Sequence, residues 1–318
     1  MSVDRTSAVW RRYRIEHTTR YRYAASVTGA RHRAHLIPAV HRDQQVEQFS
    51  LEVSLPLAES HRGTDFFGNS CLDFAITVPH RELTVRVDAV VAVRTPALPD
   101  QGLPWSGRSL VRRSFDPADH AGREFALTCA PFLVDSPLIP ACHEAGQWAL
   151  RHMGRGRQAK PLHELLLSLT RAIHREFVFD PEATTVRSPV SEVFRIKRGV
   201  CQDFAHVMIA ALRDIGIPAR YASGYILTHP PAGQARLVGA DATHAWVEAW
   251  CPGHGWFGLD PTNGKAVSDE FITLARGRDY SDVIPLRGVV TGGGNHTLEV
   301  AVSMSPLRHD SRSAAEGK

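Results

Sequence analysis

The sequence predicts an α+β protein, with an antiparallel β domain at its N-terminus and a mixed helical and β core behind it. Along residues 11–95 apolar and polar side chains alternate, which is the pattern of strands with one buried face. From residue 161 onward leucine-rich helical spacing comes first, and strand-like alternation follows after Pro218. A chain of 318 residues with 43% hydrophobic and 22% charged residues is long enough for two such units with sizeable cores.

The predicted elements divide the chain into five segments. Residues 1–100 form the N-terminal β domain, residues 101–160 a helical connection, and residues 161–290 the core. Residues 291–306 supply a closing strand. Residues 307–318 are small and charged, which predicts a disordered tail.

Each element has its own signal. Alternation predicts the strands of the β domain, and Pro-Gly-rich turns bound those of the core. Apolar residues at i, i+3 and i+4 predict the long core helix, and Ser188-Pro189 is a cap and first position for a short one. The expected strands are 13–23, 49–55, 72–76, 83–93, 219–228, 243–251, 256–260 and 298–302, and the expected helices are 118–130, 138–153, 162–173, 189–196 and 201–212.

Composition excludes several classes of function. No run of about 18 apolar residues is present to span a membrane, and the first residues lack the apolar core of a secretory signal. We therefore expect a cytoplasmic protein without membrane partners. The net charge is +4, with arginines densest in residues 1–35. There Arg14, Arg20 and Arg22 alternate with apolar or aromatic residues, which favours a solvated strand face over a nucleic-acid surface.

Cysteine and histidine usage favours neither disulfides nor metals. The five cysteines are widely spaced and include no Cys-x-x-Cys pair, which disfavours a disulfide framework and a zinc ribbon. His32 and His35 could lie together, but no third ligand completes a site. We expect no metal and no other cofactor.

The segment 199–218 predicts a tight turn that delivers Cys201 to the first turn of a buried helix. Apolar residues recur at helical spacing from Cys201 to Leu212, and Gly216 and Pro218 end the helix. A thiol in the first turn lies at the positive end of the helix dipole beside unpaired N–H groups, and both favour thiolate. The pattern suits a nucleophile, although a buried structural cysteine fits the same residues.

Two later residues could complete a catalytic set with Cys201. Cysteine catalysis needs a base for the thiol proton and a third group that orients the base. His244 opens one predicted strand and Asp260 ends the next. His206 lies on the helix of Cys201 but points away from it, which indicates a structural role or a pocket wall.

The predicted hairpin raises a geometric difficulty. A tight turn at Gly253-His254 sets Asp260 opposite Val247, about 10 Å along the strand from His244. A wider loop, a stagger or a bulge is then needed. Glu248 and Asp241 remain alternatives for the orienting role.

The sequence resembles the transglutaminase-like proteins of bacteria, within the papain-like thiol enzyme superfamily. The resemblance covers nearly the whole chain and is most specific around Cys201, His244 and Asp260. It rests on the β-strand pattern of residues 13–23 and on the motifs Gly199-Val200-Cys201-Gln202-Asp203-Phe204-Ala205-His206, Gly216-Ile217-Pro218-Ala219-Arg220-Tyr221, His244-Ala245-Trp246, Gly258-Leu259-Asp260-Pro261-Thr262-Asn263 and Gly277-Arg278-Asp279-Tyr280-Ser281-Asp282-Val283.

This resemblance implies a papain/transglutaminase-like core in which a helix bearing the catalytic cysteine packs on an antiparallel sheet that carries histidine and aspartate. It implies nucleophile Cys201, base His244 and orienting residue Asp260. Backbone N–H groups at the start of the cysteine helix are candidates for the oxyanion site. Further candidates for oxyanion or substrate binding are Gln202, Trp246, Glu248 and Trp256, although tryptophans serve equally as core residues.

The chemistry so implied is attack of a thiolate on an amide carbonyl of a protein or peptide substrate. Hydrolysis of the acyl-enzyme would make the protein a cysteine peptidase or amidase, and transfer to an amine would make it a transglutaminase. No calcium-loop spacing supports calcium-gated cross-linking. The sequence favours hydrolysis, with acyl transfer second and a catalytically silent peptide-binding module third.

Overall fold

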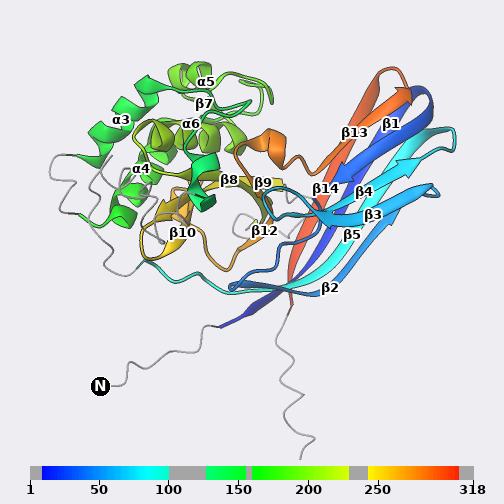
Figure 1. The fold of residues 1–318 in the computed structure, drawn as a ribbon, viewed down its shortest axis with the longest axis horizontal. Helices are drawn as coiled ribbons and strands as arrows, with labels where there is room; N and C mark the ends of the chain where they lie inside the picture. The colour runs from blue at the N-terminus through cyan, green and yellow to red at the C-terminus, as the bar shows by residue number, and fades with distance from the viewer. Residues whose placement is uncertain (1–8, 100–126, 155–159, 229–242, 308–318) are drawn as a thin grey trace, which may run out of the picture.

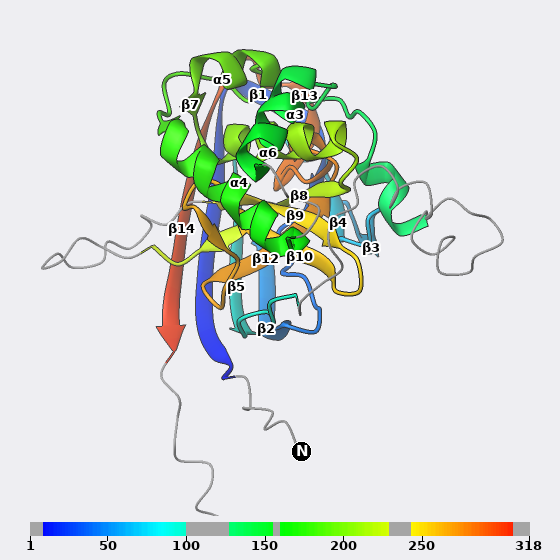
Figure 2. The same cartoon turned by 90° about the vertical axis from the view of Figure 1, so that its left-hand side faces the viewer.

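The computed structural model describes residues 9–99, 127–154, 160–228 and 243–307, which form two β-sheets and a layer of helices (Figure 1). Figure 2 shows the helices in front, the second sheet behind them and the long strands of the first sheet at the back. No helix in these ranges is long and apolar enough to cross a membrane. The expected helix at 118–130 falls mainly outside the described residues, as does the tail beyond residue 307.

The first sheet is antiparallel and is organised around its long first strand, β1. The first half of β1 pairs with β5 and β14, and its second half pairs with β4 and β13. Strands from both ends of the described chain therefore meet in one sheet. Its members are β1 (Arg11–Ala34), β2 (Gln44–Val53), β3 (Glu59–Thr64), β4 (Ser70–Ile76), β5 (His80–Val93), β13 (Leu286–Gly292) and β14 (His296–Leu307).

The strands expected in the first sheet are present, and the structure adds β3 and β13, which were not predicted; β11 and β12, described below, were not predicted either. Strand β3 was not predicted, because its sequence Glu-Ser-His-Arg-Gly-Thr has no apolar face. Strand β13 begins inside the segment assigned to the core, but it pairs with β1 of the first sheet. Pairing across more than 250 residues leaves no local signal in the sequence.

The second sheet has the strand order β11-β10-β9-β8-β12, and all its neighbours are antiparallel. Strand β9 matches its predicted bounds, and β8 and β10 match theirs to within two residues. The members are β8 (Ala219–Ile226), β9 (Thr243–Cys251), β10 (Gly255–Asp260), β11 (Lys265–Ala266) and β12 (Phe271–Gly277).

Helices cover one face of this second sheet, and the first sheet packs near its other face. The buried apolar faces of the helices, which include Leu166, Leu169 and Ile209, pack against Val247 and Leu259 of the second sheet in one core cluster. The helical elements are η1 (Ala130–Phe132), α3 (His143–Met153), α4 (Leu162–Glu176), α5 (Val190–Ile196), α6 (Cys201–Asp214) and η3 (Tyr280–Asp282), and a two-stranded parallel ribbon joins β6 (Val178–Phe179) to β7 (Arg198–Gly199).

A second cluster of buried residues joins the two sheets. Tyr225 and Ile272 of the second sheet pack against Ile15 and Val302 of the first. Within this interface His17 Nδ1 lies 2.9 Å from the Tyr225 hydroxyl, and its Nε2 lies 2.8 Å from Thr19 Oγ1. Burial lowers the pKa of His17 to about 4, so the ring is neutral.

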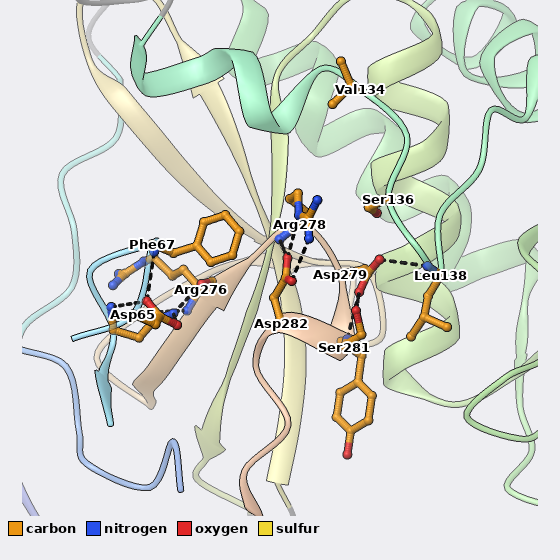
Figure 3. Close-up of polar contacts among 12 residues, drawn as sticks. Asp65, Phe67, Val134, Ser136, Leu138, Arg276, Arg278, Asp279, Ser281 and Asp282 are labelled. Atoms are coloured by element: carbon orange, nitrogen blue, oxygen red, sulfur yellow. Dashed lines mark hydrogen bonds and ion pairs between the residues drawn. The ribbon is translucent and has the colours of Figure 1, made fainter. Parts of the chain in front are cut away.

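The segment between β12 and β13 fastens the sheets to the helical layer (Figure 3). Asp279 accepts hydrogen bonds from the backbone N–H groups of Leu138 at 2.8 Å and Ser281 at 2.8 Å. Arg278 Nε donates to Asp282 Oδ2 at 2.9 Å. His206 of α6 is buried, and its Nε2 accepts the backbone N–H of Tyr280 at 3.2 Å. The expected structural role of His206 is confirmed.

Candidate active site

Cys201 is the first residue of α6, and the turn before it is fixed by a buried carboxylate. Asp203 Oδ2 accepts the backbone N–H of Val200 at 2.8 Å and the Thr184 hydroxyl at 2.6 Å. A Cβ on Gly199 would lie 2.5 Å from the same oxygen, so only glycine allows this approach. Burial raises the pKa of Asp203, although both hydrogen bonds oppose that shift.

Cys201 differs from the other four cysteines in its exposure. Its side chain is partly exposed, whereas Cys71, Cys129, Cys142 and Cys251 are buried free thiols. Burial raises the pKa of both Cys129 and Cys251 to about 12. A reagent in solution therefore reaches one thiol far more readily than the other four.

His244 and Asp260 are brought together by the register of the hairpin β9–β10. Cys251 pairs with Gly255, so the turn has three residues, and Leu259 pairs with Val247. Asp260 thus lies beside Trp246, diagonally adjacent to His244 on one face of the sheet. The turn expected from the sequence was one residue too short. The longer turn removes the geometric difficulty without a bulge.

Asp260 is fully buried and accepts four hydrogen bonds. His244 Nε2 donates to Oδ2 at 2.9 Å, and Asn263 Nδ2 donates to the same oxygen at 2.7 Å. The backbone N–H groups of Thr262 and Asn263 donate to Oδ1 at 2.9 and 3.2 Å. Burial would raise the pKa of Asp260, but the bond to His244 and the bonds from Asn263 outweigh burial and lower it.

The surroundings of His244 stabilise its charged form. Burial alone would lower its pKa, but hydrogen bonds and charge interactions with Asp260 and Cys201 raise it to about 10. Because Nε2 faces Asp260, Nδ1 is the nitrogen left for the thiol. Trp246 and Phe271 pack around the ring with centroids 6.4 and 6.2 Å away. This apolar packing limits water and strengthens an ion pair at the site.

Two of the four further candidates have other partners. Gln202 Nε2 donates to the backbone carbonyl of Val186 at 3.0 Å, which holds the neighbouring loop. Glu248 is buried, and its carboxylate accepts from Arg220 Nε at 2.7 Å and from Arg276 Nε at 2.9 Å. The two guanidinium groups lower the pKa of Glu248 to about 2 against the effect of burial. Glu248 does not contact His244 and so does not orient it; Asp241, the other alternative, lies outside the described residues.

The two tryptophan candidates are held by packing. Trp246 has no exposed surface, so its indole cannot contact a substrate in this arrangement. Trp256 is partly exposed and stacks on the Arg220 guanidinium at 4.1 Å. Trp256, Glu248 and Phe271 line a cavity of about 430 Å³ between the second sheet and the connection from β1 to β2. In the four described ranges no group of three or more His, Cys, Asp or Glu side chains is placed to hold a metal ion.

Sequence reasoning missed three residues that support this arrangement. Thr184 and Asp203 fix the turn before Cys201, and Asn263 fixes Asp260. An acidic residue at the third helical position, such as Asp203, is typical of a helix N-terminus. The usual capping-box motif also has Ser or Thr at the cap position, where this chain has Val200, so the motif is not recognisable in the sequence. Asn263 lies in the quoted motif Asp260-Pro261-Thr262-Asn263. Thr184 had no signal, because its bond to Asp203 depends on the path of the loop.

Known families match both parts of the chain. Residues 13–92 match the bacterial transglutaminase-like N-terminal region. Residues 151–261 match the transglutaminase-like superfamily, and this stretch contains Cys201, His244 and Asp260.

Individual relatives extend over different parts of the chain. An uncharacterized protein of Mycobacterium tuberculosis is 36% identical over 304 residues, which is 94% of each chain. A protein-glutamine gamma-glutamyltransferase of Pseudomonas aeruginosa is 34% identical over 113 residues, or 33% of this chain and 17% of that one.

A solved structure has the same fold. The crystal structure named "Putative Cysteine Protease from Cytophaga hutchinsonii" aligns with a TM-score of 0.74 over 95% of this chain and 93% of that chain, at 20% identity. With the two family matches, this likeness covers both the first sheet and the core. The chain therefore belongs to the transglutaminase-like superfamily and carries that superfamily's bacterial N-terminal region in front of its core.

Proposed function

We propose that the protein is a thiol-dependent enzyme that cleaves amide bonds of protein or peptide substrates through a Cys201 acyl-enzyme. The observation that carries the proposal is the buried His244, which bonds Asp260 through Nε2 and has a pKa raised by Asp260 and Cys201. A thiol, an imidazole and a carboxylate in contact are the parts that cysteine catalysis requires. The roles are nucleophile for Cys201, base for His244 and orienting group for Asp260.

In the first step the Cys201 thiolate attacks the amide carbonyl and forms a tetrahedral intermediate. The first backbone N–H groups of α6 have no carbonyl partner within the helix, and they are positioned for a developing oxyanion. His244 then gives its proton to the leaving nitrogen, which departs as amine or ammonia. Asp260 holds the ring in place and stabilises its charge.

In the second step a nucleophile resolves the acyl-enzyme. We propose water, activated by the neutral His244, which makes the protein a peptidase or amidase. The likeness in fold to a structure named as a cysteine protease supports this choice. The second candidate is acyl transfer to an amine, favoured by the 34% identity with a protein-glutamine gamma-glutamyltransferase across part of the core.

Selective alkylation tests the proposed nucleophile. At neutral pH iodoacetamide should modify Cys201 at least tenfold faster than the buried thiols, as mass spectrometry of the digested protein would measure. Cys201→Ser should remove the fast phase, and His244→Ala should slow it, because the imidazole no longer takes the proton. Cys251→Ser serves as the matched control. Equal labelling of all five cysteines would contradict the proposal.

A second experiment separates hydrolysis from transfer. The protein is incubated with a glutamine peptide library, with and without a labelled primary amine. Backbone or side-chain amide hydrolysis without incorporation supports the hydrolase. Incorporation of the amine without cleavage would contradict the hydrolase and support the transferase. Neither product from any peptide, with a reactive Cys201, would favour a peptide-binding module.

A further inference from the structure

Large apolar side chains gather on the surface just before the nucleophile. Between residues 127 and 286, the described part of the chain exposes five of them by about half or more. Three lie within nine residues of one another: Val178 at 56%, Phe179 at 56% and Val186 at 54%. Scattered apolar residues on a surface are ordinary, but exposed apolar residues on the chain that borders a proposed nucleophile are a candidate binding surface.

The first part of this group is bonded to the chain that leads to Cys201. Strand β6 runs parallel to β7, with Phe179 beside Gly199. The backbone N–H of Asp180 donates to the Gly199 carbonyl at 2.8 Å. Phe179 is therefore held one strand spacing from a residue that lies two positions before Cys201.

The second part is bonded to the first turn of α6 itself. The Val186 carbonyl accepts from Gln202, and the Thr184 hydroxyl donates to Asp203. Both partners directly follow Cys201 in the helix. Val186 is thus bonded to the residue that follows Cys201, and Phe179 is paired with the residue two positions before Cys201.

The size and charge of this surface define what it can bind. One strand spacing and two residues place Phe179 within roughly 12 Å of Cys201, the reach of about three residues of an extended peptide. The nearest charges, on Asp180 and Arg198, pair with each other at 2.7 Å. Exposed Glu182 and Arg187 carry opposite charges in the same segment, so its charges balance and the surface attracts neither cationic nor anionic side chains.

From this arrangement we infer that Phe179 and Val186 determine specificity by receiving an apolar side chain of the substrate, within three residues of the scissile carbonyl. The inference rests on the proposed function, because it names the substrate class of the same site. Peptides with a large apolar residue near the cleaved amide are the expected substrates, and peptides with a charged residue there are disfavoured, because an apolar surface does not compensate the loss of hydration.

Two alkylating reagents test the inference without a known substrate. The rate of Cys201 modification is measured with iodoacetamide and with N-benzyl iodoacetamide, and the ratio of the two rates is the readout. The wild type should favour the benzyl reagent by about tenfold, the discrimination that one apolar contact supplies. Phe179→Ser and Val186→Ser should each move the ratio toward one, while Phe179→Leu should retain most of the preference.

Val289→Ser is the matched control, because Val289 is 78% exposed on β13 of the first sheet and distant from the Cys201 turn. Its ratio should equal that of the wild type. A benzyl preference that is absent from the wild type, or that survives both serine variants, would overturn the inference. Slow reaction of Cys201 with both reagents would instead overturn the proposed function. In that case the ratio of the two rates, measured over longer reaction times, still shows whether Phe179 and Val186 bind the benzyl group.

Discussion

Replacement of Asp260 by asparagine tests the core of the proposed site, since it changes one atom of a fully buried group. Oδ2 accepts from two side chains and Oδ1 from two backbone N–H groups. Asparagine offers one oxygen and one NH₂ group. In either orientation two groups that donate to the carboxylate face the NH₂ group. When His244 is one of them, its other tautomer can accept from that NH₂ group, so Asp260→Asn loses one or two hydrogen bonds and the negative charge.

The loss can be estimated from these contacts. A hydrogen bond to a charged group contributes about 1.5–3 kcal/mol, so the loss of one or two of them amounts to about 1.5–6 kcal/mol. That is a large share of the roughly 5–15 kcal/mol of a typical domain. Burial, now unopposed by Asp260, should also lower the pKa of His244 from about 10. Thiol alkylation at neutral pH should fall by about 10²–10⁴-fold, as for other triads with a misdirected imidazole.

The stability of the wild type should show a matching dependence on pH. The pKa of His244 is raised to about 10, so its contribution is fully present below pH 6.5 and is lost as pH rises through about 10. The pKa of Asp260 is lowered, so its contribution is present above pH 3.8 and is lost as pH falls below that value. In Asp260→Asn the free energy of unfolding should therefore depend less on pH at both the acidic and the alkaline end.

The assays are urea unfolding for stability and the rate of iodoacetamide labelling between pH 5 and 10 for reactivity. Asp88→Asn is the control, because Asp88 pairs with Arg14 on the first sheet, where its side chain is 41% exposed. That variant should match the wild type within about 0.5 kcal/mol. If Asp260→Asn unfolds and reacts like the wild type at every pH, the assigned role of Asp260 is refuted.

Three further predictions concern other buried groups. Glu248→Gln leaves two mostly buried guanidinium groups, those of Arg220 and Arg276, without a carboxylate. It should destabilise the fold by about 3–5 kcal/mol in urea, while Cys201 of the folded fraction keeps its labelling rate. A strong fall in that rate would return Glu248 to the proposed catalytic set. The pKa of His17 is about 4 in the fold against 6.5 for an ordinary histidine, so its protonation should destabilise the protein between those values, by up to about 3 kcal/mol. His17→Gln should reduce the dependence of stability on pH in this range by that share, and the rest comes from His32, His41 and His206, whose pKa values burial also lowers to about 4. An unchanged dependence in His17→Gln would contradict the assigned burial effect on His17. Gly199→Ala sets a Cβ 2.5 Å from the Asp203 carboxylate, which should displace the turn before Cys201. The rate of Cys201 alkylation should fall strongly, while the urea midpoint of unfolding changes little. Alkylation at the wild-type rate would show that this turn is not needed for reactivity.

The elements that carry the proposed catalytic residues could be predicted from the sequence because their signals are local. Alternation fixed the bounds of β9, and helical spacing placed Cys201 at the start of α6. The register of β9 and β10 could not be predicted, because Gly253 and Gly255 allow turns of different length. Their φ angles of 77° and 96° belong to the three-residue turn that forms.

Contacts between distant segments were the other limit. Tryptophan and glutamate on the strand of His244 suggested a substrate surface, but Trp246 is in the core and Glu248 is paired with two arginines. Both arginines lie more than 25 residues away, so no local pattern connects them to Glu248. For the same reason β14 could be expected as a strand but not assigned to the first sheet, and β13 was not predicted as a strand.

The pairing of β1 with β13 and β14 has a consequence for the synthesis of the protein on the ribosome. Strand β1 is among the first described segments made, yet its partner β14 ends at Leu307. On the ribosome this edge of β1 stays unpaired until residue 307 has emerged, and an unpaired edge is a template for aggregation. The second sheet and its thiol helix can assemble meanwhile, but the sheet behind them completes last. Chains cut short before Leu286 would therefore carry an assembled Cys201 turn on an unfinished support, and they are expected to aggregate.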